Sequence, residues 1–344
     1  MQKQLKRLKK IAYYTILIVV CFEVALWILG FRPYTNVDYK VESQPNNAFL
    51  GDRLLGIKLN PGTYAITLND SVKFTATHLK NNQRLVPATN ISNTTPTQTI
   101  HFMGCSFTYG YGVNDAETYV NLCQKSFPNS LVKNYGVMGY GTIQSALQLN
   151  QIADPTTAKL KENDIVLLCF SSHHFMRNSL SQEYRSRLKI GYENSSKDLQ
   201  KEMDLANFPM RSSCANKTTF VKWIKMYKNW FGRDYFASIN FLQSTYDRYI
   251  DSKTEEIAIT QCLIEEMANK CAKNKVKFAV ICLNQNNRTE ELHQNLPTIR
   301  WLDIGFDFSN KNITNLPYDS HPNSKGHLFI HHKIHPFLAQ LLSK

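Results

Sequence analysis

The sequence predicts an α/β protein with a mostly parallel, doubly wound sheet, preceded by one N-terminal transmembrane helix. Three observations support this fold class. Residues 11–31 form an apolar run about long enough to cross a bilayer as a helix. From residue 99 onward, strand-like runs alternate with helical patterns, an order typical of parallel sheets. Two of those runs, 164–170 and 277–283, are almost continuously apolar, as strands buried on both faces are.

The N-terminal apolar run extends from Ile11 to Phe31 and follows a basic tail at residues 1–10. Because positive residues favour the cytoplasmic side, we expect a single-pass membrane protein with a cytoplasmic N-terminus and a periplasmic or otherwise extracytoplasmic domain. Glu23 is the one charge in the run, and we expect it near the far headgroups or against a partner helix. A cleaved signal peptide is the alternative, but the run is long for one and no small-x-small cleavage site follows it.

The composition of the 344-residue chain is that of a folded protein, since 43% of its residues are hydrophobic. The net charge is +13, an excess that suits anionic lipid headgroups or acidic glycans. We find no nucleic-acid-binding module and expect no nucleic-acid partner. The eight cysteines include no C-x-x-C pair, which excludes a zinc ribbon or a thioredoxin-like motif. Cys169, Cys262 and Cys282 lie in apolar runs, so we expect them to be small buried side chains.

The chain beyond the anchor divides into two parts. Residues 32–98 are polar with short strand-like patches, and we interpret them as a β-rich linker region. Residues 99–344 form the α/β domain. Residues 178–252 break the strand and helix alternation and are long for a crossover, so they are interpreted as an insertion or lid. Within it, 220–231 mixes lysines and aromatics at helical spacing; this predicts a packed amphipathic helix, with an interfacial helix as the alternative.

Each element of the α/β domain has its own signal. A helix is expected at 118–127, because Tyr119, Leu122 and Cys123 share one helical face. A second helix is expected from residue 144. A long third helix is expected at 254–273, because it begins with acidic residues and ends with lysines, which matches the helix dipole. Strand-like apolar runs predict strands at 99–104, 131–135, 164–170, 277–283 and 299–304.

Two segments far apart in the sequence carry candidate chemistry. Ser106 lies on a glycine-flanked turn after the first predicted strand, where an α/β protein presents a nucleophile. His321 follows the last predicted strand, and Asp319 lies two residues before it. A histidine can accept the serine proton, and a carboxylate can fix the tautomer of that histidine. The alternatives are a structural turn serine and a loop histidine near a turn-forming aspartate.

A glycine-rich loop follows the second predicted strand, from Asn134 to Gly141. Its glycines allow a tight turn with an unobstructed backbone N–H, and Gly139 is the candidate oxyanion donor. Gly139 also fits a turn that requires positive φ, and the two roles are compatible.

Three segments of the domain resemble the first, second and fifth sequence blocks of the SGNH/GDSL hydrolase superfamily, in the family's order. They are 104–110 (G-C-S-F-T-Y-G), 134–141 (N-Y-G-V-M-G-Y-G) and 319–327 (D-S-H-P-N-S-K-G-H). The resemblance implies a three-layer α/β/α, flavodoxin-like fold and a serine-dependent esterase, lipase or acyltransferase. It implies that Ser106 is the nucleophile, Gly139 an oxyanion donor, His321 the base and Asp319 its partner, with Asn134 a further possible site residue.

The third block departs from the family, which places an oxyanion-binding asparagine after the third strand. Ungapped matching puts His173 there, followed by His174. Since an imidazole N–H also donates, His173 is a candidate oxyanion donor and His174 a possible site residue. The substitution is compatible with a retained oxyanion hole, an altered substrate or lost catalysis. His173, His174 and His321 also allow a metal-dependent hydrolase as a minor alternative, but adjacent histidines rarely reach one metal, so we expect neither metal nor cofactor.

The combination of an anchor, a β-rich region and this domain resembles anchored family members that act on cell-surface polysaccharides, often on O-acetyl groups. The sequence therefore predicts a membrane-anchored serine ester hydrolase acting on a small acyl ester or glycan substrate, with the bilayer contacted through residues 11–31. An O-acyltransferase using the same residues and a catalytically inactive glycan-binding or partner-binding protein are the alternatives.

Overall fold

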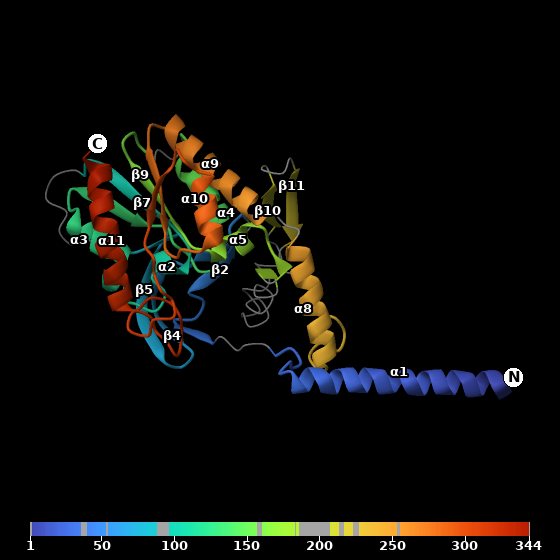
Figure 1. Cartoon of the computed structure of the whole chain (residues 1–344). Helices are drawn as coiled ribbons and strands as arrows, with labels where there is room; N and C mark the ends of the chain where they lie inside the picture. The colour runs from blue at the N-terminus through green and yellow to red at the C-terminus, as the bar shows by residue number, and fades with distance from the viewer. Residues whose placement is uncertain are drawn as a thin grey trace.

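The computed structural model describes the chain from residue 2 to residue 343, apart from several internal segments. The described residues are 2–35, 40–52, 54–87, 96–156, 160–182, 184–185, 207–212, 217–222, 227–252 and 255–343. Helix α1 (Gln2–Ile28) extends away from the body of the molecule (Figure 1), and nearly all of its side chains are exposed. It is long and apolar enough to cross a membrane.

The parallel part of the main sheet has five strands, β7 (Gln98–Gly104), β8 (Ser130–Asn134), β9 (Ile165–Phe170), β12 (Lys277–Cys282) and β13 (Arg300–Asp303). They pair in the order β8-β7-β9-β12-β13, and every pairing in this series is parallel. This is the flavodoxin-like order: β8 lies on one side of the first parallel strand, β7, and the later strands are added on its other side. The predicted doubly wound α/β fold is therefore confirmed.

The sheet continues past β8 into the region predicted to be a β-rich linker. Strands β1 (Val41–Gln44), β4 (Gly62–Leu68), β5 (Val72–Leu79) and β6 (Gln83–Arg84) add to it in the order β1-β4-β5-β6-β8, all antiparallel. Arg84 of β6 pairs with Asn134 of β8. Among the described residues, the predicted linker region and the α/β domain therefore share one nine-stranded sheet. Strands β2 (Phe49–Asp52) and β3 (Gly56–Leu59) form a separate hairpin.

Helices cover both faces of the parallel strands and complete three layers (Figure 1). Leu167 and Cys169 of β9 face a core shared with α3 (Tyr119–Ser126) and α11 (Ser324–Leu342). Val166 and Leu168 face the opposite core, shared with α4 (Thr142–Ile152), α9 (Glu256–Lys273) and α10 (Asn287–Gln294). This alternation follows from the two-residue period of a strand and explains why β9 is apolar throughout.

The insertion contains a hairpin of β10 (Asn207–Ser212) and β11 (Lys217–Lys222), followed by helix α8 (Ala237–Asp251). The helix predicted over 220–231 was wrong, because 220–222 belong to β11 and 231–235 form turns. Pairing with β10 decides the conformation of β11, and local spacing does not reveal such a partner. Cys262 also differs from expectation, because it is disulfide-bonded.

Candidate active site

Ser106 lies at the carboxyl end of β7, where the strand turns directly into the short helix α2 (Ser106–Tyr109). The turn is so tight that a side chain at Gly104 would collide with the Thr108 side chain and the Cys169 carbonyl, which explains the glycine. Gly110 ends α2 in the left-handed conformation, with φ of 88°, which glycine adopts without strain. The serine hydroxyl is thus held at the sheet edge, and the residue is 5% exposed.

A continuous chain of hydrogen bonds joins Ser106 to the two residues predicted as its partners. His321 Nε2 lies 2.8 Å from Ser106 Oγ. On its other side, His321 Nδ1 lies 2.6 Å from Asp319 Oδ1. If Nδ1 carries the proton and donates it to the carboxylate, Nε2 is free to accept the serine proton. The geometry is that of a serine–histidine–carboxylate triad.

Asp319 can reach the His321 ring from only two residues away because the loop curls around the carboxylate. Asp319 Oδ1 also accepts a hydrogen bond from the backbone N–H of His321 at 2.7 Å. The loop is closed by a backbone bond from Asn315 N–H to the His321 carbonyl, 3.0 Å. Asn323 then caps α11 by accepting from Gly326 N–H at 3.0 Å. These contacts fix the imidazole above the sheet edge.

The triad is partly enclosed by aromatic rings. The Phe107 ring lies 5.0 Å from the His321 ring, and the Tyr111 ring lies 5.1 Å from it. Phe107 in turn stacks on Phe308 at 4.6 Å. The Asp319 side chain is 4% exposed and that of His321 is 18% exposed. The carboxylate is therefore shielded from water while the base stays reachable from solvent.

Asn134 holds the glycine-rich loop against helix α2. Its amide donates to the Thr108 carbonyl at 2.9 Å and accepts from Gly136 N–H at 2.9 Å. A side chain at Gly136 would collide with the backbone of Thr108 and Tyr109. Through these contacts Asn134 supports α2.

Gly139 lies in the turn after β8, with φ of 73°. Its carbonyl accepts a hydrogen bond from the hydroxyl of Tyr184 at 2.6 Å. Tyr184 is buried, and burial raises the pKa of its hydroxyl to about 12, so it stays protonated and donates. This contact could not be predicted from local sequence, because Tyr184 lies in the insertion, 45 positions along the chain from Gly139.

The two adjacent histidines after β9 lie in different environments, at the start of helix α5 (His173–Asn178). The His173 ring lies 6.0 Å from Phe107 and 6.5 Å from Phe308, in the aromatic group beside His321. Its Nδ1 lies 3.0 Å from Ser171 Oγ. His174 is fully buried instead, with Nδ1 3.2 Å from Thr142 Oγ1. Burial lowers the pKa of His174 well below its usual value, so this imidazole is neutral.

Two buried residues that sequence reasoning missed support helix α2 from the antiparallel strands. The Arg84 guanidinium donates to the carbonyls of Tyr109 and Val113 at 2.8 and 2.7 Å, and to Asp115 at 2.7 Å. His78 Nε2 lies 2.8 Å from the Tyr109 hydroxyl. Both residues belong to the region predicted to be a linker, where a single arginine or histidine gives no local signal.

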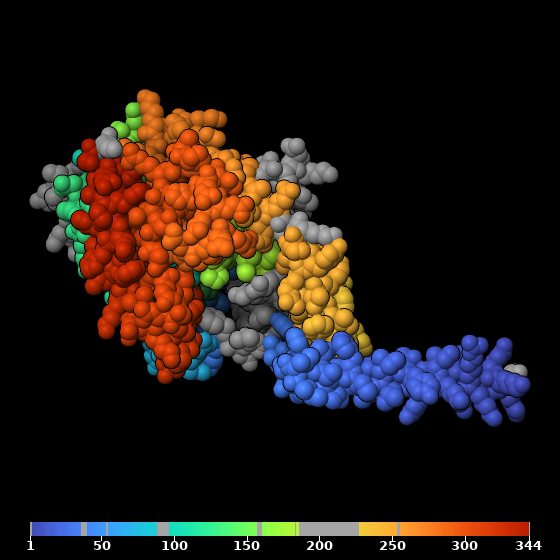
Figure 2. All heavy atoms as spheres, in the orientation of Figure 1, coloured from blue at the N-terminus to red at the C-terminus, as the bar shows by residue number. Residues whose placement is uncertain are grey.

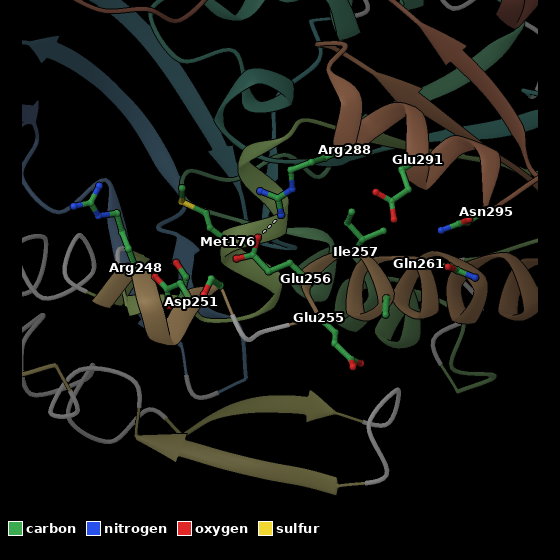
Figure 3. A pocket seen from close by; sticks show the side chains of 13 residues that line it. Met176, Arg248, Asp251, Glu255, Glu256, Ile257, Gln261, Arg288, Glu291 and Asn295 are labelled. Atoms are coloured by element: carbon green, nitrogen blue, oxygen red, sulfur yellow. Dashed lines mark hydrogen bonds and ion pairs between the residues drawn. The ribbon is translucent and has the colours of Figure 1, made fainter. Parts of the chain in front are cut away.

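A cavity of about 640 Å³ lies away from the triad, between the ends of α5, α8, α9 and α10. Figure 3 shows the charged side chains around it, with Glu256 and Arg288 paired across one wall. Arg288 also lies over the Phe175 ring, 4.4 Å from its centroid. Within the described ranges, no group of three or more histidine, cysteine, aspartate or glutamate side chains is placed to hold a metal ion.

No protein-family model matches the chain, and no curated protein matches it either. Among solved structures, it is similar to a lipolytic protein of the G-D-S-L family from Veillonella parvula, with 12% identity over 71% of this chain and 99% of that one, and a TM-score of 0.40. A putative G-D-S-L lipolytic protein from Desulfitobacterium hafniense has 11% identity over 69% and 98%, with a TM-score of 0.36. A lipase from a goat rumen metagenome has 13% identity over 70% and 97%, with a TM-score of 0.35.

Proposed function

We propose that this chain is a membrane-anchored serine ester hydrolase of the SGNH type. The observation that carries the proposal is the unbroken hydrogen-bond chain from Asp319 through His321 to Ser106. A protein that had kept the fold only for binding would have no need of this alignment. The sequence blocks around these three residues support the family assignment.

The mechanism follows from the atoms in contact. Ser106 Oγ attacks the ester carbonyl carbon while His321 Nε2 takes the hydroxyl proton. The same proton then passes to the departing alkoxide, which leaves an acyl-serine. A water molecule, deprotonated by Nε2, attacks the acyl carbon. The bond to Ser106 Oγ then breaks, the proton on Nε2 passes to Oγ, and the carboxylic acid is released. Asp319 holds the imidazole and stabilises its charged form throughout.

The negative charge on the carbonyl oxygen requires nearby hydrogen-bond donors. We assign this role to the backbone N–H groups of Ser106 and Gly139 and to the imidazole of His173. Ser106 is the first residue of α2, where backbone N–H groups lack partners within the helix. His173 belongs to the same aromatic group as His321, which supports its assignment.

The substrate that we propose is an acyl ester, most simply an O-acetyl ester, of a cell-surface glycan or lipid. In this proposal α1 anchors the enzyme with its basic end in the cytoplasm, and the hydrolase domain faces the periplasm or another extracytoplasmic space. The disulfide at Cys262 supports that location, since disulfides persist in oxidising compartments. Transfer of the acyl group to an acceptor hydroxyl would use the same three residues.

The test is hydrolysis of p-nitrophenyl esters of increasing acyl length by the full-length protein in detergent, followed by acetate release from O-acetylated polysaccharides. We expect short acyl esters to be hydrolysed and Ser106→Ala to abolish turnover. Ser324→Ala is the matched control, because Ser324 is exposed at the start of α11. Acyl transfer to an added polysaccharide in preference to water would establish the transferase instead. Turnover that survives in Ser106→Ala would refute both.

A further inference from the structure

An exposed apolar surface surrounds the junction between α1 and the insertion. Phe231 is 99% exposed and Tyr235 is 79% exposed, although such side chains are usually buried. We call this surface the junction face, and its residues are Trp230, Phe231, Tyr235, Phe236, Leu242, Tyr246 and Tyr249. An apolar surface of this extent indicates a contact with another molecule or with a membrane.

The helical part of the junction face points away from the α/β domain. Leu242, Tyr246 and Tyr249 follow one another at four and three residues, so they share one side of α8. Asp251 lines the cavity beside α9, and at about 100° per residue it lies roughly opposite Leu242. The Trp230 ring lies 5.7 Å from that of Tyr246, which joins the preceding turn to the same surface.

The acidic residue of the apolar run fixes α8 to α1. The two carboxylate oxygens of Glu23 accept hydrogen bonds from the backbone N–H groups of Ala237 and Ser238, at 2.7 and 2.9 Å. These are the first two residues of α8, so a charge in one helix caps the other. Trp27 Nε1 donates to the same carboxylate at 3.0 Å.

Further contacts stiffen the junction. The Phe241 ring of α8 lies 4.9 Å from Phe31 and 6.3 Å from Phe22. Asn240 donates to the carbonyl of Arg32 at 2.9 Å. Figures 1 and 2 show α8 standing on the C-terminal part of α1, with the rest of α1 extending away from the body. The orientation of α8 is therefore set by the helix that we take to cross the membrane.

We propose that the junction face is a second membrane contact, seated in the outer interface of the bilayer that α1 crosses. Glu23 lies five residues before Ile28, the last residue of α1, which is about 7.5 Å along the helix axis. A turn bonded to Glu23 therefore lies near the end of the span, at the depth of the outer interface, when residues 11–31 cross the bilayer. Tryptophan and tyrosine concentrate at that depth, where an apolar ring meets water.

This arrangement also accounts for the polar groups that would enter the membrane. Backbone N–H groups near lipid require partners, and Glu23 supplies them for Ala237 and Ser238. Exposed charges flank the face at Lys228, Asp234 and Arg248, and in this proposal they lie among the lipid headgroups while the rings enter the interface. The junction face would hold the hydrolase domain in one orientation on the membrane.

The test places a tryptophan in the junction face of the full-length protein, in nanodiscs of phosphatidylcholine that hold one copy each. We expect the emission added by Phe231→Trp to be blue-shifted and quenched at least twofold by lipids brominated along the acyl chain. Leu328→Trp is the control, because Leu328 is exposed on α11 at the far side of the domain from α1 (Figure 1). Its added emission should stay at the wavelength of a tryptophan in water.

Two outcomes would overturn the proposal. Added emission from Phe231→Trp that is water-like and unquenched would mean that the face does not meet lipid. Emission that is blue-shifted but insensitive to brominated lipid would mean that another protein surface covers it. In Glu23→Ala, quenching of the introduced tryptophan should fall at least twofold because the cap is lost; unchanged quenching would refute the role of Glu23.

The proposal depends on α1 spanning the bilayer, and the same samples test that part separately. Trp27 lies in α1, so Trp27→Phe should remove quenched emission from the wild-type signal. If Trp27 is quenched and Phe231→Trp is not, the anchor stands and the junction-face contact fails. If neither is quenched, the anchor itself fails. Ester hydrolysis in detergent is measured independently of both.

Discussion

The ends of two neighbouring strands, β7 and β9, hold their chemical groups through different kinds of contact. These strands pair in parallel, with Gly104 opposite Cys169. After β7, Ser106 is aligned with His321, and the helix that it begins is held by Asn134 and Arg84. After β9, the His173 imidazole meets the hydroxyl of Ser171 and the edges of aromatic rings.

The difference separates two kinds of contribution to one site. The β7 end has the contacts of a group that must be placed before substrate arrives, since a misplaced nucleophile loses the advantage of orientation. The β9 end presents an imidazole that lies among rings on one side of the triad. We interpret the first as the reacting centre and the second as the part that can be adapted to a particular ester.

The strongest effect is expected from Asp319→Asn. The change keeps the size of the side chain, but the amide can favour the wrong tautomer of His321, and kcat should fall by about 10⁴-fold. Asp307→Asn in the same loop is the control, since Asp307 is exposed and its carboxylate accepts hydrogen bonds from Ser309. The measurement is kcat on the best p-nitrophenyl ester. A loss below tenfold would show that the carboxylate does not position the base.

Arg84→Met tests whether the β7 end is held rigidly by buried contacts. The variant removes the buried guanidinium that donates to Asp115 and to the carbonyls of Tyr109 and Val113, which should lower the free energy of unfolding by about 3–5 kcal/mol. The measurement is urea denaturation, with Arg300→Met, at an exposed position of β13, as the control. Equal stability of the two variants would remove the contrast between the strand ends.

His173→Ala tests the β9 end. Loss of one oxyanion donor lowers kcat by about 10²–10³-fold, and we expect a change in that range with little change in stability. His173→Asn should recover part of the rate, because an amide N–H also donates. His332→Ala is the control at an exposed position of α11. A KM effect without a kcat effect would make His173 a substrate-binding residue only.

Tyr184→Phe tests whether the insertion supports the Gly139 turn. Removing the hydroxyl leaves the Gly139 carbonyl without this donor, and a net loss of about 1 kcal/mol corresponds to a fall in kcat of about fivefold. Tyr227→Phe is matched, since that hydroxyl donates to Asp247 within the insertion at 2.6 Å. If both variants retain full kcat, the Gly139 turn does not depend on Tyr184.

Stability should fall in acid because neutral histidines are buried near both strand ends. Burial lowers the pKa of His78 to about 4 and that of His174 well below its usual value. Below about pH 6.5 these histidines are protonated in the unfolded chain but remain neutral in the folded chain. The free energy of unfolding is therefore highest above pH 6.5 and falls toward pH 4, by up to about 1.4 kcal/mol per pH unit for each histidine.

Thermal denaturation between pH 7 and pH 4 measures this slope. His78→Gln should reduce it, because one buried imidazole is gone, whereas His332→Gln at an exposed position should leave it unchanged. A slope that is the same in wild type and His78→Gln would contradict the assignment of His78 as a buried neutral group.

The parallel sheet and the grouping of Ser106, Asp319 and His321 could be predicted from the sequence. Both predictions rest on local signals, namely apolar runs and short motifs that follow strands. Continuous apolar runs mark strands buried on both faces, and strand ends in one direction meet at one edge. The supports of the site were not predictable in this way. Arg84 and Tyr184 act on groups that are distant in the sequence, and their neighbours in the chain give no sign of it.

The helix expected over 220–231 failed for the same reason. Its spacing fits a helix, but 217–222 pair with β10, and a partner strand outweighs local preference. Glu23 is the opposite case. The sequence marked it as an unexplained charge in an apolar run, and the structure shows that it caps α8.

The central claim is that Ser106 is an activated nucleophile. The most direct measurement is reaction of the full-length protein with a fluorophosphonate, followed by mass spectrometry of its peptides. We expect one adduct, on Ser106, and no adduct in His321→Ala. An unlabelled but folded wild type, or an adduct that persists in His321→Ala, would contradict it.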